Sequence, residues 1–418
     1  MMEGTAAASR ERLSLLDDPD ADEPPPADGR WQPLLDGEHA AHARAVAEDI
    51  VLALEQQPPS QEHGFLGDAS IALVLAHCGR PSADARLDSA LNAIGARPPT
   101  ISLFTGLSGL SWLIDHLVAE AEADALLAHF DAALLRYLDV PRWQERYDLI
   151  SGLVGVGVYA AGRRGERAAR IADRVLSHLE ATAVTDDAGT TWRIPPHCLV
   201  PPRRARFPDG AIDLGVAHGV PGIVGMLAQF VDAGVQRERS LQLLGSTVAW
   251  LLDAVPRGLP RFGTDWPADP AERKRMGWCY GDPGVAGVLL RAGGALASPA
   301  LAQEAVALLA QVAEPLATSG APDACFCHGA AGLAHIYNLA FQRTGSVPMR
   351  DQARRWLGEV LRLRTPGTGI AGYRFLKADD ATHWEPDATL LSGAAGIALV
   401  LLAAVEDQEP AWPALCLL

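Results

Sequence analysis

Hydrophobic and polar positions follow a helical period along much of the chain. Between about residues 37 and 57, Ala43, Val46, Ile50 and Leu54 recur at the spacing that puts them on one face of a helix. Five more alanine-rich segments share this period and predict amphipathic helices. They span residues 121–138, 167–182, 237–252, 301–317 and 350–363. Strand-like alternation is scarce, so the pattern predicts an all-α protein.

A short glycine motif recurs between these segments. Seven Gly-x-x-Gly motifs, each followed by small and apolar residues, recur at intervals of 42 to 67 residues. The first glycines of these motifs are Gly64, Gly106, Gly152, Gly219, Gly281, Gly329 and Gly393. Glycine lets backbones approach closely at a helix start, so each motif predicts an inner helix paired with an amphipathic outer helix. Because both ends of the series carry a full motif rather than a polar cap, we expect closure into an α/α toroid of seven inner and seven outer helices.

Two parts of the chain depart from the repeat. Residues 1–30 are acidic and proline-rich and lack the apolar residues that a core requires, so we expect a disordered arm. The toroid domain then spans residues 31–418. Its longest interval between motifs holds an irregular insert at about residues 185–213, and a second loop covers residues 255–270. Long loops in a compact fold are often lids or binding surfaces.

Composition and charge exclude some functions. The formal net charge is −16, which argues against a nucleic-acid partner, because such a partner requires clustered basic residues. No apolar run of about 18 to 20 residues predicts a transmembrane segment, and the start of the chain lacks a secretory signal, so we expect a cytoplasmic protein. The 6 cysteines are spread thinly, which in a reducing compartment favours metal binding or free thiols over disulfides.

Candidate metal ligands stand directly before two of the glycine motifs. Cys279 and Cys327 each lie two residues before a first glycine, and His328 follows Cys327. If the repeats are equivalent, these residues face one mouth of the toroid, at helix N-termini that favour thiolates. Two cysteines, one histidine and an open fourth position are the ligand set of a catalytic zinc site. Three unrelated buried residues are the alternative, but the shared repeat position of the cysteines favours Zn²⁺.

A candidate general acid/base lies at the equivalent position of another repeat. His218 directly precedes Gly219, as His328 precedes Gly329, and is expected to face the same mouth. A histidine that only caps the helix by a hydrogen bond is the alternative. Asp148 and Arg275 also lie near the motifs, but each taken alone is better explained as a surface or capping charge.

Together these motifs resemble the lanthionine synthetase C-like family, in order, from about residue 40 to residue 405. The matching stretches are Asp148-Leu-Ile-Ser-Gly152, Leu214-Gly-Val-Ala-His-Gly-Val-Pro-Gly222, Arg275-Met-Gly-Trp-Cys-Tyr-Gly281, Cys327-His-Gly329 and Leu390-Leu-Ser-Gly-Ala-Ala-Gly396. The resemblance implies an α/α toroid, in agreement with the repeats. It also implies functional residues: Cys279, Cys327 and His328 as zinc ligands, and His218, Asp148, Arg275 and Tyr280 as catalytic residues.

The resemblance further implies an activity. Lantibiotic cyclases of this family add a peptide cysteine thiol to dehydroalanine or dehydrobutyrine and form lanthionine or methyllanthionine rings. The expected mechanism reserves the fourth zinc position for the substrate thiol. His218, oriented by Asp148, accepts its proton, and Arg275 stabilises the enolate. Which of His218 and Arg275 delivers the proton to the α-carbon stays open.

The same resemblance implies partners. The substrate is a dehydrated precursor peptide with leader and core. The chain is too short for a dehydratase domain, so a separate dehydratase is expected. An exporter is a further partner, and the cytoplasmic protein would associate with the membrane through this biosynthetic complex.

Two alternatives from other classes remain. A non-catalytic toroid of the same family would bind zinc together with a peptide, glutathione or a partner protein; Asp148, His218 and Arg275 beside the ligands count against it. A carbohydrate-active α/α toroid would need paired carboxylates at the mouth. Only Asp148, Glu62 and Asp282 are candidates there, and they do not form a matching pair.

Overall fold

A computed structural model of the chain describes residues 30–94, 100–256, 258, 261–268, 276–319, 321–376 and 383–418. The acidic arm at residues 1–29 lies outside the described residues, so its expected disorder stays a prediction. The described part is mostly helical, as expected for the all-α class. Among its helices, none is both long and apolar enough to cross a membrane.

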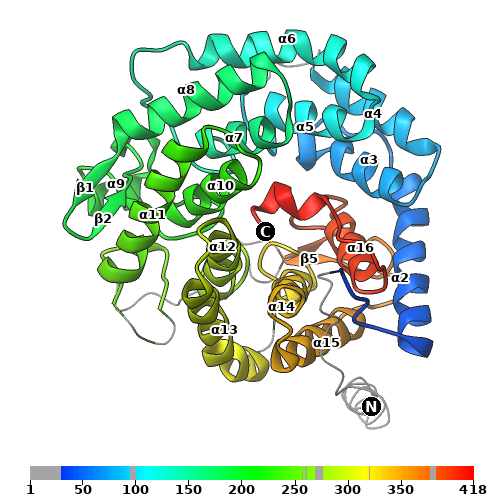
Figure 1. The fold of residues 1–418 in the computed structure, drawn as a ribbon. Helices are drawn as coiled ribbons and strands as arrows, with labels where there is room; N and C mark the ends of the chain where they lie inside the picture. Colours follow the sequence, from blue (N-terminus) through cyan, green and yellow to red (C-terminus); the bar gives the residue numbers. More distant parts are fainter. Residues whose placement is uncertain are drawn as a thin grey trace.

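Seven helices form a closed inner ring (Figure 1). They are α3 (Asp68–His77), α5 (Leu107–Leu117), α7 (Leu153–Gly162), α10 (Val220–Asp232), α12 (Asp282–Ala295), α14 (Ala330–Thr344) and α16 (Ala394–Ala403). Six of them begin directly after the first glycine of a motif, and α3 begins after the second glycine of its motif. Each inner helix contacts the next, and α16 contacts α3, so the ring is closed.

An outer helix packs against each inner helix. The outer helices are α2 (Gly37–Glu55), α4 (Ser82–Ile94), α6 (Glu120–Leu138), α8 (Glu166–Thr182), α11 (Arg237–Ala254), α13 (Pro299–Ser319) and α15 (Val347–Arg362). Six of them follow their inner partner in the sequence, but α2, the first described helix, packs against α16, the last inner helix. The predicted α/α toroid of seven inner and seven outer helices is thus confirmed, and the two ends of the chain close it.

Close backbone contact explains the second glycine of the motifs. In six repeats, a Cβ atom at this glycine would overlap the carbonyl oxygen of the residue six positions earlier. The pairs are Gly109 with Leu103, Gly155 with Leu149, Gly222 with Val216, Gly284 with Trp278, Gly332 with Phe326, and Gly396 with Leu390. The loop before each of these inner helices therefore folds back onto the first turn of the helix, and only glycine leaves room for it.

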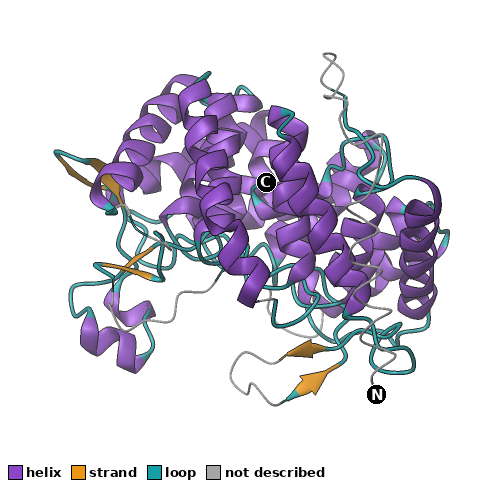
Figure 2. Ribbon diagram, turned by 90° about the horizontal axis from the view of Figure 1, so that it is seen from below, coloured by secondary structure: helices purple, strands orange, loops and turns teal. Residues whose placement is uncertain are grey.

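Short elements interrupt the loops. In the predicted insert, β1 (Val184–Asp186) pairs with β2 (Gly189–Thr191), followed by η2 (Pro196–Cys198) and α9 (Pro201–Arg206). Then β3 (Ile212–Asp213) pairs with β4 (Asp265–Trp266), and nearer the C-terminus β5 (Phe375–Leu376) pairs with β6 (Trp384–Glu385). The insert is therefore more regular than the sequence suggested. Figure 2 shows the β3–β4 and β5–β6 pairs and most loops on one side of the helical ring.

The C-terminal residues fill the centre of the ring, where Figure 1 shows the end of the chain. After η3 (Trp412–Cys416), the side chains of Leu417 and Leu418 are buried. The indole Nε1 of Trp278 donates to the carbonyl of Cys416 (2.9 Å), which ties this segment to the loop before α12. The toroid is therefore a packed body rather than an open channel at this level.

We predict that Gly109→Ala destabilises the fold, because its Cβ would overlap the carbonyl oxygen of Leu103. Overpacking of this kind costs about 1 to 3 kcal/mol, which thermal or urea unfolding measures. Gly245→Ala is the matched control, since Gly245 lies within α11 and a Cβ there meets nothing within 4 Å. The control should be neutral or slightly stabilising. Equal stability of the two variants would contradict the steric role of the motif.

Candidate functional site

Backbone hydrogen bonds join the loops that precede neighbouring inner helices. The amide of Cys279 donates to the carbonyl of Cys327 (3.1 Å), and the amide of Cys327 donates to the carbonyl of Leu391 (2.8 Å). On the other side, the amide of Ala217 donates to the carbonyl of Cys279 (3.4 Å). All four residues lie two positions before a first glycine. We call this series of bonds the loop belt; it brings equivalent positions of adjacent repeats side by side.

The belt brings three candidate metal ligands together. One ligand atom each from Cys279, Cys327 and His328 lies within 4.8 Å of the others. Cys279 is buried, while Cys327 and His328 are half-buried. Gly277 permits this approach, since a Cβ there would lie only 2.8 Å from the Cα of His328. Cys279 and Cys327, which are 48 positions apart in the sequence, thus lie in one cluster, as the repeat alignment predicted.

A buried carboxylate lies behind the cluster. His328 Nε2 is 3.4 Å from Asp323 Oδ2, and Asp323 Oδ1 accepts the amide of Cys325 (3.0 Å). Burial would raise the pKa of Asp323, but the hydrogen bond and charge of His328 outweigh it, so this pKa lies below its ordinary value. A histidine that binds a metal commonly gives its other nitrogen to a carboxylate. Asp323 is thus placed to orient the ring of His328 as a metal ligand.

The chemistry of this donor set fits Zn²⁺. The pKa of the Cys327 thiol is raised well above its ordinary value because the Cys279 sulfur lies beside it and because the site is buried. Two thiols so placed cannot both ionise easily without a cation between them. A divalent ion removes that penalty, and sulfur and imidazole are ligands that Zn²⁺ prefers. These residues are therefore suited to hold zinc.

A histidine–carboxylate pair is held by the loops before α7 and α10. His218 Nδ1 is 3.0 Å from Asp148 Oδ2, and Asp148 Oδ1 accepts the amide (2.7 Å) and hydroxyl (3.0 Å) of Ser151. Asp148 is 1% exposed. Burial would lower the pKa of His218, but the hydrogen bond and charge of Asp148 outweigh it and raise this pKa. The pair has the arrangement of an oriented acid/base.

A second polar network, which the sequence did not reveal, holds Tyr280. The phenol of Tyr280 donates to Asp213 Oδ2 (3.1 Å), and its ring centroid is 6.1 Å from that of His218. Arg203 of α9 also donates to Asp213 Oδ2 (2.7 Å) and, through Nε, to Asp265 (2.9 Å). Burial and the charge of Asp213 raise the pKa of Tyr280, so it stays a neutral phenol. The insert thus reaches the site through Arg203.

The two buried carboxylates that the sequence did not reveal, Asp213 and Asp323, occupy the same position relative to a glycine motif. Asp213 and Asp323 each lie six residues before a first glycine, as does Asp387. In all three, Oδ1 accepts the amide two residues later: 2.8 Å at Asp213, 3.0 Å at Asp323 and 2.6 Å at Asp387. Such turns form locally, so the recurrence of aspartate at this position was the available signal.

The other predicted residues differ in their outcome. Arg275 lies outside the described residues, so its role stays a prediction. Asp282, a candidate for a carboxylate pair, accepts the amides of Arg261 (2.9 Å) and Phe262 (2.7 Å) and is buried. Its carboxylate therefore supports the loop before α12 from inside.

Comparison with known proteins agrees with this architecture. The sequence profile described as "Lanthionine synthetase C-like protein" matches residues 67–417. The chain belongs to the lanthionine synthetase C-like family. No curated protein sequence matches it. Among solved structures, nisin cyclase has a TM-score of 0.65 at 18% identity, over 90% of this chain and 98% of that chain. At 18% identity, this similarity establishes that the two proteins share a fold.

We predict that Asp148→Asn lowers the pKa of His218 in the metal-free protein. The wild-type pKa should lie above the ordinary value, whereas in the variant burial dominates and the pKa falls. Because the folded-state pKa is raised, the pair stabilises the fold below the unfolded-state pKa, and this contribution is lost as the pH rises through the folded-state pKa. NMR titration of the imidazole measures the shift.

The control for this titration is Asp139→Asn, which removes an exposed carboxylate that pairs with Arg174. It should leave the pKa of His218 unchanged. An unchanged pKa in Asp148→Asn as well would show that Asp148 does not set the charge of His218.

Proposed function

We propose that this chain is a zinc-dependent lanthipeptide cyclase. It would add cysteine thiols of a dehydrated precursor peptide to dehydroalanine or dehydrobutyrine and so form thioether rings. The observation that carries the proposal is the cluster of Cys279, Cys327 and His328 beside the His218–Asp148 pair, at one end of adjacent inner helices. Membership of the lanthionine synthetase C-like family supports it.

Cys279, Cys327 and His328 would hold the zinc ion, and Asp323 would orient His328. Bound zinc supplies a Lewis acid that lowers the pKa of a substrate thiol at an open position. The two protein sulfurs make the donor set rich in electrons, which suits a thiol nucleophile better than a set of neutral ligands.

His218 is the proposed proton carrier. The addition breaks the S–H bond and the alkene π bond and forms S–Cβ and Cα–H bonds, so it needs a proton acceptor and a proton donor but no redox partner. Asp148 holds Nδ1 of His218 at 3.0 Å, which leaves Nε2 as the nitrogen that exchanges the proton. The raised pKa of His218 favours acceptance of the thiol proton. The resulting imidazolium is a source of the proton for Cα.

Tyr280 and Arg275 complete the proposed set of catalytic residues. The phenol of Tyr280 is fixed by Asp213 beside His218, where it would form a neutral wall of the site. Arg275 is four residues before Cys279 in the sequence, and we assign it to stabilisation of the enolate oxygen formed after attack. Either Arg275 or His218 would then deliver the final proton.

Proposed partners follow from this reaction. One structural neighbour is nisin cyclase, and we propose a dehydrated precursor peptide as the substrate of the present chain. We also propose that a separate dehydratase generates the alkene side chains and that an exporter removes the product. The cytoplasmic location and membrane association of such a complex belong to the same proposal.

We predict that the zinc-loaded protein removes alkylatable thiols from a dehydrated precursor peptide without changing its mass. Mass spectrometry after treatment with a thiol-alkylating reagent detects each ring as one lost adduct. A chelator or Cys327→Ala should preserve the free thiols and lower the zinc content from about one ion per chain. Cys78→Ala is the control, since burial and nearby Glu406 raise the pKa of that thiol to about 11. Persisting thiols with the zinc-loaded protein would instead indicate a toroid that only binds.

We predict that His218→Asn slows ring formation by about 10²- to 10⁴-fold, the usual contribution of a positioned acid/base, with unchanged zinc content. A time course of thiol loss, together with metal analysis, measures both quantities. His129→Asn removes an exposed histidine from α6 and should have no effect. Full activity of His218→Asn with normal zinc would remove His218 from the mechanism.

A further inference from the structure

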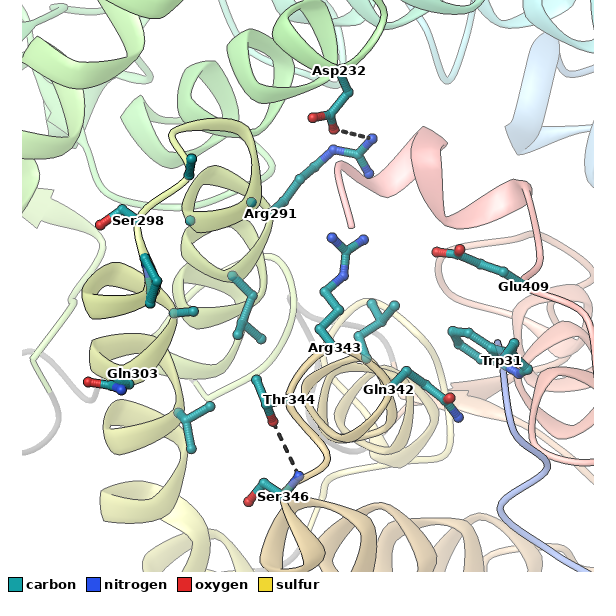
Figure 3. A pocket seen from close by; sticks show the side chains of 18 of the residues that line it. Trp31, Asp232, Arg291, Ser298, Gln303, Gln342, Arg343, Thr344, Ser346 and Glu409 are labelled. Atoms are coloured by element: carbon teal, nitrogen blue, oxygen red, sulfur yellow. Dashed lines mark hydrogen bonds and ion pairs between the residues drawn. The ribbon is translucent and has the colours of Figure 1, made fainter. Parts of the chain in front are cut away.

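A large cavity lies at the end of α12 and α14 remote from the proposed zinc site. Its volume is about 1250 Å³, and it is bounded by the last turns of α12 and α14 and the first turns of α13 (Figure 3). The zinc-site residues precede the first turns of α12 and α14, whereas the cavity begins at Leu290. At 1.5 Å per residue along a helix, the two regions are separated by roughly 12 Å or more. The cavity is therefore distinct from the proposed zinc site.

Two guanidinium groups face each other across one part of this cavity. Figure 3 shows the side chain of Arg343 directed towards that of Arg291. Arg291 donates to the main-chain oxygen of Leu418 (2.7 Å) and pairs with Asp232 (3.2 Å), but its buried Nε has no hydrogen-bond partner among the described residues. Arg343 is exposed at the cavity, and it forms neither a hydrogen bond nor an ion pair within the described part of the chain. One positive charge here is thus left without a counter-charge in contact.

The pKa values of neighbouring groups reflect the positive charge of Arg343. Burial, and next the charge of Arg343, lower the pKa of Arg291, while Asp232 and Glu409 oppose that effect. Arg343 also lowers the pKa of the buried His335, after burial itself. The first turn of α13 borders the same cavity and adds the positive end of a helix dipole. Such surroundings favour an anion.

Apolar side chains form much of the remaining lining. Leu290, Val306 and Leu339 border the cavity, together with Ala302 and Ala307. Gly293 and Gly294 also line it. A site with an apolar surface and a few convergent polar groups is the usual form of a small-molecule pocket. A small inorganic ion would not contact these apolar side chains.

We propose that this cavity binds a small amphiphilic anion, with its carboxylate or phosphate at Arg343 and Arg291 and its apolar part against Leu290, Val306 and Leu339. A guanidinium donates two parallel hydrogen bonds to such a group. The ligand neutralises the unpaired charge of Arg343 and separates two like charges. Because the cavity lies apart from the zinc ligands, this inference stands independently of the proposed cyclase function.

The competing explanation is that Arg343 only compensates the dipole of α14, since it lies in the last turn of that helix. In that case Arg343→Gln would lower stability slightly without affecting any ligand. The two explanations therefore predict different responses of one variant, provided that binding and unfolding are both measured.

The test is calorimetric titration of the zinc-loaded, full-length protein with three probes: acetate, octanoate and 1-octanol. We expect saturable binding of octanoate, with a Kd at least about tenfold lower than that of acetate, because the chain adds apolar burial. Arg343→Gln should raise the octanoate Kd by about tenfold or more, and inorganic phosphate should compete with octanoate. Arg170→Gln, which removes an exposed arginine from α8, is the control of equal charge change and should bind as wild type does.

Several results would overturn the inference. Equal affinity for 1-octanol and octanoate would reveal an apolar cavity that does not recognise charge. Equal affinity for acetate and octanoate would show that the apolar lining contributes nothing to binding. Absence of saturable octanoate binding would reject the site. Unchanged octanoate affinity in Arg343→Gln, with a lower unfolding midpoint, would assign Arg343 to the helix dipole alone. Zinc content and ring formation, measured on the same variants, should not change.

Discussion

The loop belt is the interaction on which the arrangement of side chains at the mouth of this toroid depends. Each bond in it is an ordinary amide–carbonyl contact, such as that from Cys279 to Cys327 at 3.1 Å, but it joins loops that would otherwise be free to move apart. The motif glycines make the belt possible, because they let each loop lie against the first turn of its own helix. Helix packing alone would hold the ring together; the belt sets the positions of the side chains at its mouth. The cluster at Cys279, Cys327 and His328 is a consequence of this shared backbone geometry.

The sequence predicted the fold well because the repeat is a strong local signal. Glycines at a fixed step and amphipathic segments between them indicated both rings of helices and placed Cys279 and Cys327 at equivalent positions. Asp213 and Asp323 were missed, although both lie six residues before a first glycine. The partner of Asp213 is Tyr280, which lies 67 residues away in the sequence, and Asp323 reaches His328 across a folded loop. A linear pattern does not reveal either pair. The regular elements of the insert were missed for a similar reason: Arg203 and Asp265, which anchor it, are 62 residues apart.

Helix α12 connects two different chemical environments within one buried element. The loop directly before it carries the soft donor Cys279 and the close approach at Gly277, while its last turns carry Arg291 among apolar side chains. Between them, Gly287 faces Leu418 in the filled centre of the ring. The buried middle of the helix therefore separates the two ends, and each end takes its character from the loops around it rather than from the helix itself.

Closure of the ring by the two ends of the chain has a consequence for folding. The indole of Trp31 donates to the carbonyl of Ala403 (3.0 Å), a contact between residues 372 positions apart, and α2 packs against α16. During synthesis, α2 is made before every inner helix of the ring, whereas its partner α16 is made after the other six, so the apolar face of α2 stays uncovered until the inner ring is complete. Contacts this distant in sequence form slowly, because the loop entropy is lost before they are gained. The newly made chain is thus an open arc with two unprotected edges, the stage at which such proteins are most exposed to aggregation and most dependent on chaperones.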